Sequence, residues 1–566
     1  MQRFIFISIL LLLTACGGGG GVSSPPPVNN PPAVDDDSGD NDNDNDNDND
    51  NNDEEEEVVV VVDTALAHCT TPTGSNTFTN VTTELGLCYD AWENDDPTEM
   101  EKTAGGLGMA DIDNDGMMEL YVAHGHSALG RLFSYDGETF VERETNIELL
   151  GMDLAGYFVD IDADGFKDFI SNQYEGVEVF KNDGNGDFEP WTDVSGINQL
   201  RPTWSMAAGD YNLDGDLDLF FTHWGTGWTD YFAEYLWDND GMGTFVDQTF
   251  RTPIATATTD TGIESEYTFT PIFADYNNDG YPDLLLANDF GSSQVLLSVN
   301  NGNIFADDTT EVITDENGMG NAVADYDRDG DLDWFVTSIY RPETPPVRNG
   351  NRLYRNNGVA AGFEDVTDEA GVREGDWGWG ACFADFDNDG HLDLFHTNGH
   401  QEPGQPEFED DPSRLFMSNG DGTFTDRAME LGLTHTAQGR GLICTDYNTD
   451  GKVDVFIANN GNSPTVFRND HDNDNHFIGI DLFGIEQNLE AIGARVTVRT
   501  ASGAQIGEVQ LGNAYLSHGP ATLHFGLGQD DVIESIDVWW PGSDPLTSRI
   551  ANVTVDQYIT IKHPTR

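Results

Sequence analysis

Basic residues are scarce in this sequence. Its 566 residues include 24 lysines and arginines against 103 aspartates and glutamates, which gives a formal net charge of −79 at pH 7. So strong a negative charge repels phosphate backbones and anionic lipid headgroups, and we therefore expect no nucleic acid partner. Part of the excess is local, because residues 35–57 hold 14 acids and no base.

Recognisable catalytic motifs are also missing. The sequence has no nucleophile elbow, phosphate-binding loop or dinucleotide fingerprint, and no Cys-x-x-Cys or His-Glu-x-x-His motif. Their absence weakens an enzymatic interpretation but does not exclude one, because a repeat fold can assemble a site from separate repeats.

The apolar run at residues 5–13 is too short to span a bilayer as a helix. Arg3 precedes it, and the tetrapeptide Leu-Thr-Ala-Cys that ends at Cys16 looks like the lipobox of a bacterial lipoprotein. We therefore interpret residues 1–15 as a lipoprotein signal peptide and Cys16 as the lipidated residue. No acid follows Cys16 directly, which favours the outer membrane of the bacterial cell envelope, periplasmic or surface-facing. The low-complexity stretch 16–63 then predicts an extended acidic tether.

Cysteine is rare, with five residues in all. Cys69 and Cys88 lie near the start of the folded region, and in an oxidising compartment we expect them to form a disulfide. Cys382 and Cys444 precede two acidic loops on equivalent strands, where they point to opposite faces. Two such strands in adjacent repeats meet through opposite faces, so a disulfide is open, but we favour two buried thiols.

Acidic residues recur at a fixed spacing. Residues 385–393 read Asp-Phe-Asp-Asn-Asp-Gly-His-Leu-Asp, with oxygen side chains at the first, third, fifth and ninth positions and a glycine at the sixth. Alternate carboxylates on a tight turn point to one centre, which is how proteins hold Ca²⁺. Because the flanks read as strands, the pattern predicts calcium loops in β-hairpins rather than EF-hands.

Seven copies of this loop are present, and so many copies in register argue against mere solvated turns. We expect up to seven structural calcium ions as cofactors. The predicted ligands, loop by loop, are Asp111, Asp113, Asp115 and Glu119; Asp160, Asp162, Asp164 and Asp168; Asp210, Asn212, Asp214 and Asp218; Asp275, Asn277, Asp279 and Asp283; Asp325, Asp327, Asp329 and Asp333; Asp385, Asp387, Asp389 and Asp393; Asp446, Asn448, Asp450 and Asp454. The first loop closes with Glu119, and three loops carry Asn at the third position, so these four sites are expected to bind more weakly.

The spacing of the loops predicts the fold. Successive copies start 49 to 65 residues apart, and each interval reads as four short strands. Seven such repeats predict an all-β, seven-bladed β-propeller over 64–472. The last repeat lacks its fourth strand, whereas the segment around Phe78 has the pattern of one, so we expect this N-terminal strand to close the ring. The remaining residues, 473–566, predict a small C-terminal β-domain.

Two stretches resemble known families. The Asp-x-Asp-x-Asp-Gly-x-x-Asp loops between residues 77 and 470 are similar to the FG-GAP or VCBS repeats of integrin α-type propellers. The tail, with AIGARVTV, GNAYLSHGPATLHFGLG and IDVWWPG, resembles an ASPIC and UnbV domain. This pairing resembles the cartilage acidic protein family and its bacterial relatives, and it implies a calcium-binding propeller.

The rim opposite the calcium loops is predicted to bind a ligand, because the longer insertions collect there. Our candidate ligand residues are His126, His223, Trp224, Trp377, Trp379, His400 and Arg440. In one interpretation His126, His223 and His400 converge on the axis and bind a transition metal or act as acid and base. The alternative, which we favour, is that the histidines and tryptophans pack between repeats.

The function that fits best is a membrane-anchored adhesion or ligand-binding module for protein or glycan partners at the envelope. We do not expect an enzyme. A propeller enzyme, such as a polysaccharide lyase or hydrolase with a rim active site, is the first alternative, and a scaffold of an envelope complex is the second.

Overall fold

The structure, a computed structural model, describes residues 77–565 apart from 90–100, 126–129, 148, 150, 199–200, 225–233, 255–256, 259–263, 266, 344–346, 402–407, 486–487 and 513. The signal peptide with Cys16, the tether, Cys69 and His126 lie outside the described residues. Among the described residues, no helix is both long and apolar enough to cross a membrane.

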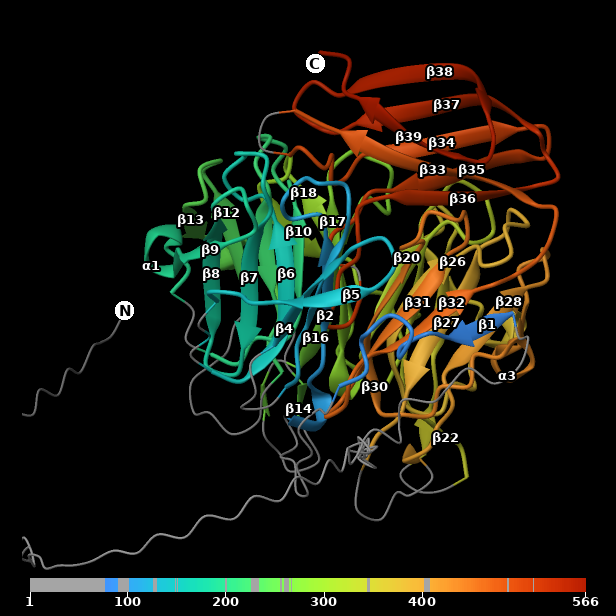
Figure 1. The fold of residues 1–566 in the computed structure, drawn as a ribbon, viewed down its shortest axis with the longest axis horizontal. Coiled ribbons are helices and arrows are strands. Elements are labelled where there is room, and N and C mark those ends of the chain that lie inside the picture. The colour runs from blue at the N-terminus through green and yellow to red at the C-terminus, as the bar shows by residue number, and fades with distance from the viewer. Residues whose placement is uncertain are drawn as a thin grey trace, which may run out of the picture. The chain divides into compact units, whose positions relative to one another are not determined.

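Seven four-stranded antiparallel sheets account for most of the described chain up to Asn469 (Figure 1). Their strands are β2–β5 (Leu107–Ala110, Glu119–Val122, Arg131–Tyr135, Phe140–Arg143), β6–β9 (Asp153–Val159, Asp168–Gln173, Val177–Asn182, Phe188–Pro190), β10–β13 (Met206–Gly209, Asp218–Phe221, Tyr235–Asn239, Phe245–Asp247), β16–β19 (Thr268–Ala274, Asp283–Asn288, Gln294–Val299, Ile304–Asp307), β20, β21, β24 and β25 (Asn321–Ala324, Asp333–Val336, Arg352–Asn356, Phe363–Asp365), β26–β29 (Gly378–Ala384, Asp393–Asn398, Arg414–Ser418, Phe424–Asp426), and β1 with β32, β31 and β30 (Phe78–Asn80, Thr465–Asn469, Asp454–Asn459, Gly439–Thr445). The predicted all-β class and the four strands per repeat are confirmed.

Each sheet follows from the same local pattern. The first two strands are apolar and buried on both faces, as in β16 and β17, because neighbouring sheets cover them on each side. The fourth strand carries a Phe followed by exposed residues, as in Phe424–Asp426, where Phe424 is buried and Thr425 and Asp426 are exposed. Short helices α1 (Thr192–Ser195), α2 (Thr367–Ala370) and α3 (Ala428–Leu431) follow three of these fourth strands.

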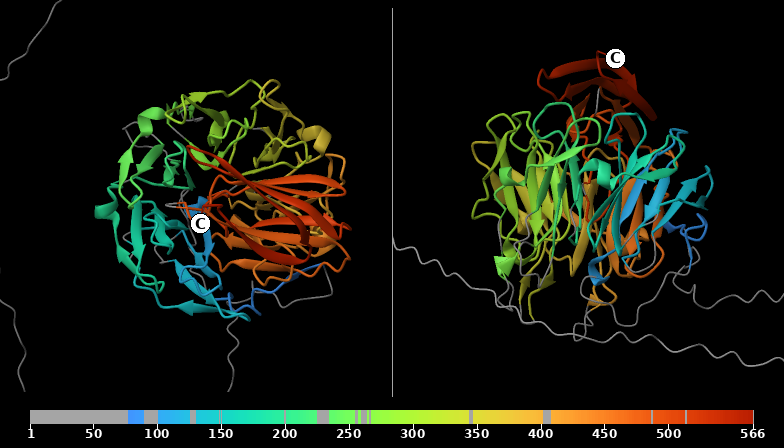
Figure 2. Two further views of the ribbon diagram at one scale, coloured as in Figure 1. Left: turned by 90° about the horizontal axis from the view of Figure 1, so that it is seen from above. Right: turned by 90° about the vertical axis from the view of Figure 1, so that its left-hand side faces the viewer.

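The N-terminal strand pairs with the last repeat, as predicted. β1 is antiparallel to β32, with Phe78 opposite Asn469, and the Phe78 ring packs against Phe386 at a centroid distance of 5.7 Å. The first strand of this last sheet, β30, in turn contacts β2 of the first sheet. Figure 2 shows the sheets arranged around a common centre when they are viewed from above.

The C-terminal region forms two further sheets on the side of the acidic loops (Figure 1). One contains β36 (Leu523–Gly528), β33 (His476–Phe483) and β39 (Gln557–Lys562), and the other contains β35 (Gly503–Glu508), β34 (Arg495–Thr500), β37 (Val532–Trp540) and β38 (Leu546–Thr554).

A segment of this region, residues 511–512 and 514–519, enters between the first strands of the repeats. The Ser517 hydroxyl accepts the Leu107 N–H at 2.9 Å, His518 Nε2 accepts the Phe158 N–H at 2.9 Å, and the Leu516 N–H donates to Ser205 Oγ at 3.1 Å. The approach is so close that a Cβ built on Gly106 would lie 2.1 Å from the Leu516 carbonyl oxygen. We expected a domain packed on the repeats, whereas the structure also places a plug, residues 511–512 and 514–519, among their inner strands.

The disulfide between Cys382 and Cys444 corrects our preference for two buried thiols. Cys382 lies on β26 and Cys444 on β30, and their sulfur atoms are bonded with a Cα–Cα distance of 6.5 Å. Because the two cysteines point to opposite faces of equivalent strands, they meet between the adjacent sheets. Cys88 is also disulfide-bonded, and Cys69, its predicted partner, lies outside the described residues.

Candidate metal centres

The seven acidic loops share one backbone geometry. In the sixth loop, Asp385 accepts N–H groups from Asp389 at 3.0 Å and Gly390 at 2.7 Å, and the Asp389 carboxylate accepts the His391 N–H at 2.9 Å. The sixth-position glycine has a positive φ in every loop, between 87° and 104°, and the fourth-position residue has a φ between 56° and 64°. This left-handed pair of residues folds each hairpin so that its alternate side chains converge.

Carboxylates do converge where the third position is Asp. Oxygens from three acids lie within 4.8 Å of one another in the first, second, fifth and sixth loops. In the other three loops the residue at the third position is Asn212, Asn277 or Asn448, which offers an amide oxygen in place of a carboxylate. Every side-chain donor in these sets is an oxygen, the ligand type of a hard dication such as Ca²⁺.

Several of these oxygens are buried without a hydrogen-bond partner, and they test whether an ion fits. At the ninth position, Asp218 Oδ1 accepts the Asn239 N–H at 2.9 Å, whereas Oδ2 is buried and unpartnered. The same holds for Oδ2 of Asp283 and Asp454. Buried carboxylate oxygens without a donor are strongly unfavourable, and a cation at the centre of the loop would satisfy them. The residues therefore fit calcium.

The raised pKa values of the loop carboxylates also indicate that a cation is needed in the loops. Burial raises the pKa of Asp168 to about 8 and that of Asp333 to about 9, and neighbouring carboxylates add to both shifts. Burial likewise raises the pKa of the first-position residues Asp210 and Asp325 to about 7. A dication reverses this effect, because it favours the charged form of each ligand.

In two loops a basic residue from another strand of the sheet lies beside the carboxylates, which sequence reasoning missed. Lys181, on β8, contacts Asp162 and lies 3.1 Å from Asp164 in the second loop. Arg143, on β5, lies 3.3 Å from Asp113 in the first loop. Lys181 comes from the third strand of its sheet and Arg143 from the fourth, and both loops therefore carry a competing positive charge.

The candidate ligand residues on the opposite side are mostly buried. The His223 ring packs against Tyr235, and its Nδ1 lies 3.1 Å from Glu234 Oε2. Burial lowers the pKa of His223 to about 3. The Trp377 ring stacks on His400 at 4.0 Å. These residues pack between strands, which is the alternative that we favoured from the sequence.

Trp224, Trp379, His400 and Arg440 meet in one aromatic cluster. Phe269 connects Trp224 to Trp379, with centroid distances of 5.3 and 6.0 Å. Trp379 also lies 5.2 Å from Tyr515 of the plug. The described contacts place His223 with Glu234 and Tyr235.

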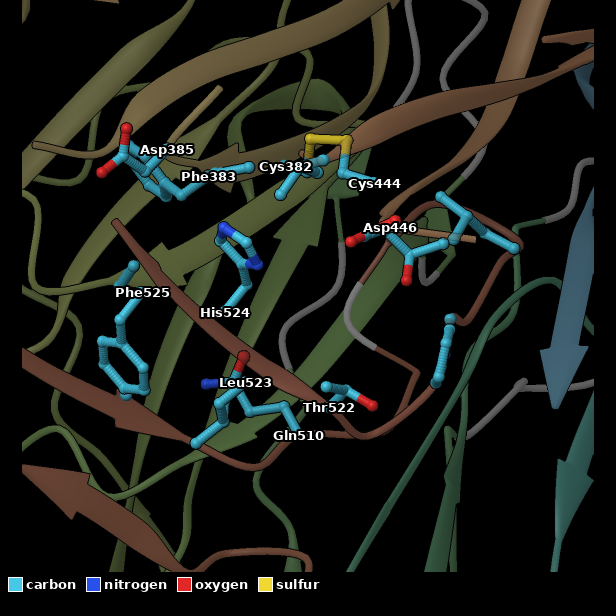
Figure 3. Close-up of a pocket in the computed structure, with 18 of the residues that line it drawn as sticks. Cys382, Phe383, Asp385, Cys444, Asp446, Gln510, Thr522, Leu523, His524 and Phe525 are labelled. Atoms are coloured by element: carbon cyan, nitrogen blue, oxygen red, sulfur yellow. A yellow bond between two sulfur atoms is a disulfide. The ribbon is translucent and has the colours of Figure 1, made fainter. Parts of the chain in front are cut away.

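A cavity of about 690 Å³ lies between the acidic loops and the C-terminal domain (Figure 3). The Cys382–Cys444 disulfide, Asp385 and Asp446 line one side of it. Thr522 and His524 line the other. Burial lowers the pKa of His524 to about 4, so its imidazole is neutral at pH 7. The cavity was not predicted, because nothing in the sequence places the tail over these loops.

Comparisons with known proteins agree with the two resemblances. Residues 160–221, 275–336 and 344–396 match the FG-GAP-like repeat family, and residues 484–566 match the ASPIC and UnbV family. The chain is similar to cartilage acidic protein 1 of Homo sapiens, with 24% identity over 544 residues that cover 86% of this chain and 75% of the human protein. The Mus musculus protein of the same name is 24% identical over 543 residues, which cover 86% of this chain and 77% of that protein.

Proposed function

This chain joins FG-GAP-like repeats to an ASPIC and UnbV domain, and from that premise we propose that it is a calcium-stabilised, lipid-anchored protein of the bacterial cell envelope that binds a protein or glycan partner. The observation that carries the proposal is the set of seven loops with equivalent backbone geometry, five of which hold a buried carboxylate oxygen without a hydrogen-bond partner.

We propose that the seven four-stranded sheets are the blades of a closed propeller. The pairing of β1 with β32 and the contact between β30 and β2 support closure, since they join the last sheet to the N-terminal strand and to the first sheet. Closure removes the open edges that an array of separate sheets would leave. Calcium would bind in the hairpin that joins the first two strands of each blade.

The partner would bind on the rim away from the calcium loops. The hairpins β14–β15 (Ala257–Thr258, Glu264–Ser265) and β22–β23 (Tyr340–Arg341, Arg348–Asn349) extend from that rim in Figure 1. The plug, residues 511–512 and 514–519, bonds to the inner strands, which favours binding of a ligand at the rim rather than on the axis. The donors of Arg440 go to main-chain carbonyls of Lys102, Gly399 and Gly439, which favours a structural role over catalysis.

The test is a binding experiment with the purified chain. A glycan array and an extract of envelope proteins are incubated with the chain in calcium and in EGTA, and the glycan supernatants are analysed for cleavage products. We expect calcium-dependent binding without product release, and weaker binding for a variant in which the β22–β23 hairpin is replaced by a short turn. Released oligosaccharide would favour the enzyme instead, and calcium-independent binding would contradict the proposed role of the loops.

A further inference from the structure

The C-terminal domain contacts the acidic loops through specific hydrogen bonds. Arg495 donates to the carbonyl oxygen of Asp275, at the start of the fourth loop, at 2.7 Å. Arg328, the fourth residue of the fifth loop, donates to the Ala504 carbonyl at 3.3 Å. These contacts place β34 and β35 directly over the loops.

The sixth loop is held at two points of a single residue. His524 Nε2 lies 2.8 Å from Asn388 Oδ1, and the Gly528 N–H donates to the Asn388 carbonyl at 2.8 Å. Asn388 is the fourth-position residue with a φ of 56°, so both bonds hold the left-handed corner that folds the loop. The Asn388 amide donates to the Gly451 carbonyl at 2.8 Å, which links this corner to the seventh loop.

The seventh loop is contacted at a predicted calcium ligand. The Tyr558 hydroxyl, on β39, donates to Asp446 Oδ2 at 2.5 Å, and the same oxygen accepts the Gly451 N–H at 2.6 Å. Asp446 Oδ1 accepts the Asp450 N–H at 3.1 Å. With Oδ2 occupied by two donors, the orientation of the carboxylate is fixed. The Tyr558 ring in turn packs on the backbone of Gly479, where an added Cβ would lie 2.1 Å from it.

We propose that Tyr558 is a positioning residue of the seventh calcium site, so that the C-terminal domain sets the calcium affinity of this loop and calcium in turn strengthens the docking of the domain. Residues that hydrogen-bond to metal ligands orient those ligands, and their loss typically lowers metal affinity about 10- to 100-fold. The effect on docking follows from linkage, because two coupled equilibria change one another by the same factor. This inference rests on the proposed function, since it presumes that the loops bind calcium.

The experiment measures each loop separately in the full chain. Hydrogen exchange followed by mass spectrometry is recorded over a series of free calcium concentrations, and the midpoint of protection is read for peptides that cover 446–454, 210–218 and 557–562. The third loop, 210–218, is the internal control, because it also has Asn at the third position and its described hydrogen bonds stay within the repeats. The variant is Tyr558→Phe, which keeps the ring on Gly479 and removes only the hydroxyl.

In the wild type we expect 446–454 and 557–562 to become protected at the same calcium concentration. In Tyr558→Phe the midpoint of 446–454 should rise about 10- to 100-fold while that of 210–218 stays in place. A midpoint of 446–454 that does not move in the folded variant would overturn the inference. Should Tyr558→Phe fail to fold, the wild type alone decides the question, because independent midpoints for 446–454 and 557–562 would overturn the inference. If none of the loops responds to calcium, the proposed function fails instead.

Discussion

The guanidinium carbon of Arg440 lies 4.2 Å from the centre of the Trp379 ring, in a position that is 1% exposed. Its N–H groups donate to carbonyls from three separate segments, at Lys102, Gly399 and Gly439. Burial lowers the pKa of Arg440 to about 9, and the side chain stays charged at neutral pH. A planar donor on an aromatic ring is a role that lysine cannot fill.

We therefore expect Arg440→Lys to lower the free energy of unfolding by about 1–3 kcal/mol, because buried carbonyls lose their donors. The measurement is urea unfolding in calcium. The matched control is Arg427→Lys, at an exposed pair with Glu430, for which we expect little change. Equal effects of the two substitutions would contradict the structural role of Arg440.

The effect of replacing a predicted calcium ligand on the stability of the protein should depend on whether calcium is present. In Asp218→Asn the amide oxygen keeps the bond from the Asn239 N–H, and the buried, unpartnered carboxylate oxygen is replaced by an amide NH₂. In calcium we expect destabilisation by about 1.4–2.7 kcal/mol, the contribution of one site at ten to a hundred times its Kd. In EGTA we expect no loss or a gain, since a buried charge has been removed.

The control for this prediction is Asp240→Asn, in an exposed turn of the same sheet. It should change little in either condition. Melting temperatures in calcium and in EGTA supply all the values, and an equal loss for Asp218→Asn in both conditions would count against a metal at this loop.

A pH effect is expected away from the loops, at Asp153. This fully buried carboxyl accepts bonds from the Tyr121 hydroxyl at 2.6 Å and from Ser171 at 3.3 Å, and burial raises its pKa to about 7. A folded-state pKa above the unfolded value of about 3.9 means that the stabilisation is complete below pH 4 and is lost as the pH rises through 7.

We therefore expect wild type to lose stability relative to Asp153→Asn between about pH 4 and pH 7, by up to about 1.4 kcal/mol per pH unit. The two proteins are unfolded in urea at several pH values and a constant calcium concentration. Parallel pH profiles would show that Asp153 does not titrate in this range.

The Cys382–Cys444 disulfide should stabilise the seam between two sheets. It closes a loop with a sequence separation of 62 residues. For the double variant Cys382→Ser, Cys444→Ser we expect the free energy of unfolding to fall by about 2–4 kcal/mol. Mass spectrometry after alkylation without reductant checks the bond itself, and two labelled cysteines at 382 and 444 would show that it is absent.

The loops and the strands could be predicted because both follow from short, local sequence patterns. Four ligands within nine residues define a loop such as 385–393 without knowledge of any distant residue, and the strands around it follow from apolar runs and turns. The pairing of Phe78 with Asn469 was also predictable, since one repeat lacked a strand that the N-terminus supplied.

What could not be predicted depends on contacts between distant residues. Nothing local to residues 511–519 indicates that Ser517 and His518 bond to Leu107 and Phe158, because hydrogen bonds to main-chain N–H groups leave no pattern in the sequence that supplies those groups. The bond from the Tyr558 hydroxyl to the Asp446 carboxylate joins two side chains 112 residues apart, and no local pattern in the sequence marks it. The rim residues were placed by connectivity, which gives the side of a sheet but not the depth at which a side chain such as Arg440 is buried.

The claim that calcium holds the seven loops together is tested most directly by one titration. The chain is stripped of metal, dialysed against calcium, and its bound calcium is counted by elemental analysis while the melting temperature is recorded with and without excess EGTA. We expect several calcium ions per chain and a strong fall of the melting temperature in EGTA. A chain that binds no calcium at millimolar concentration and melts at the same temperature in both buffers would contradict the account.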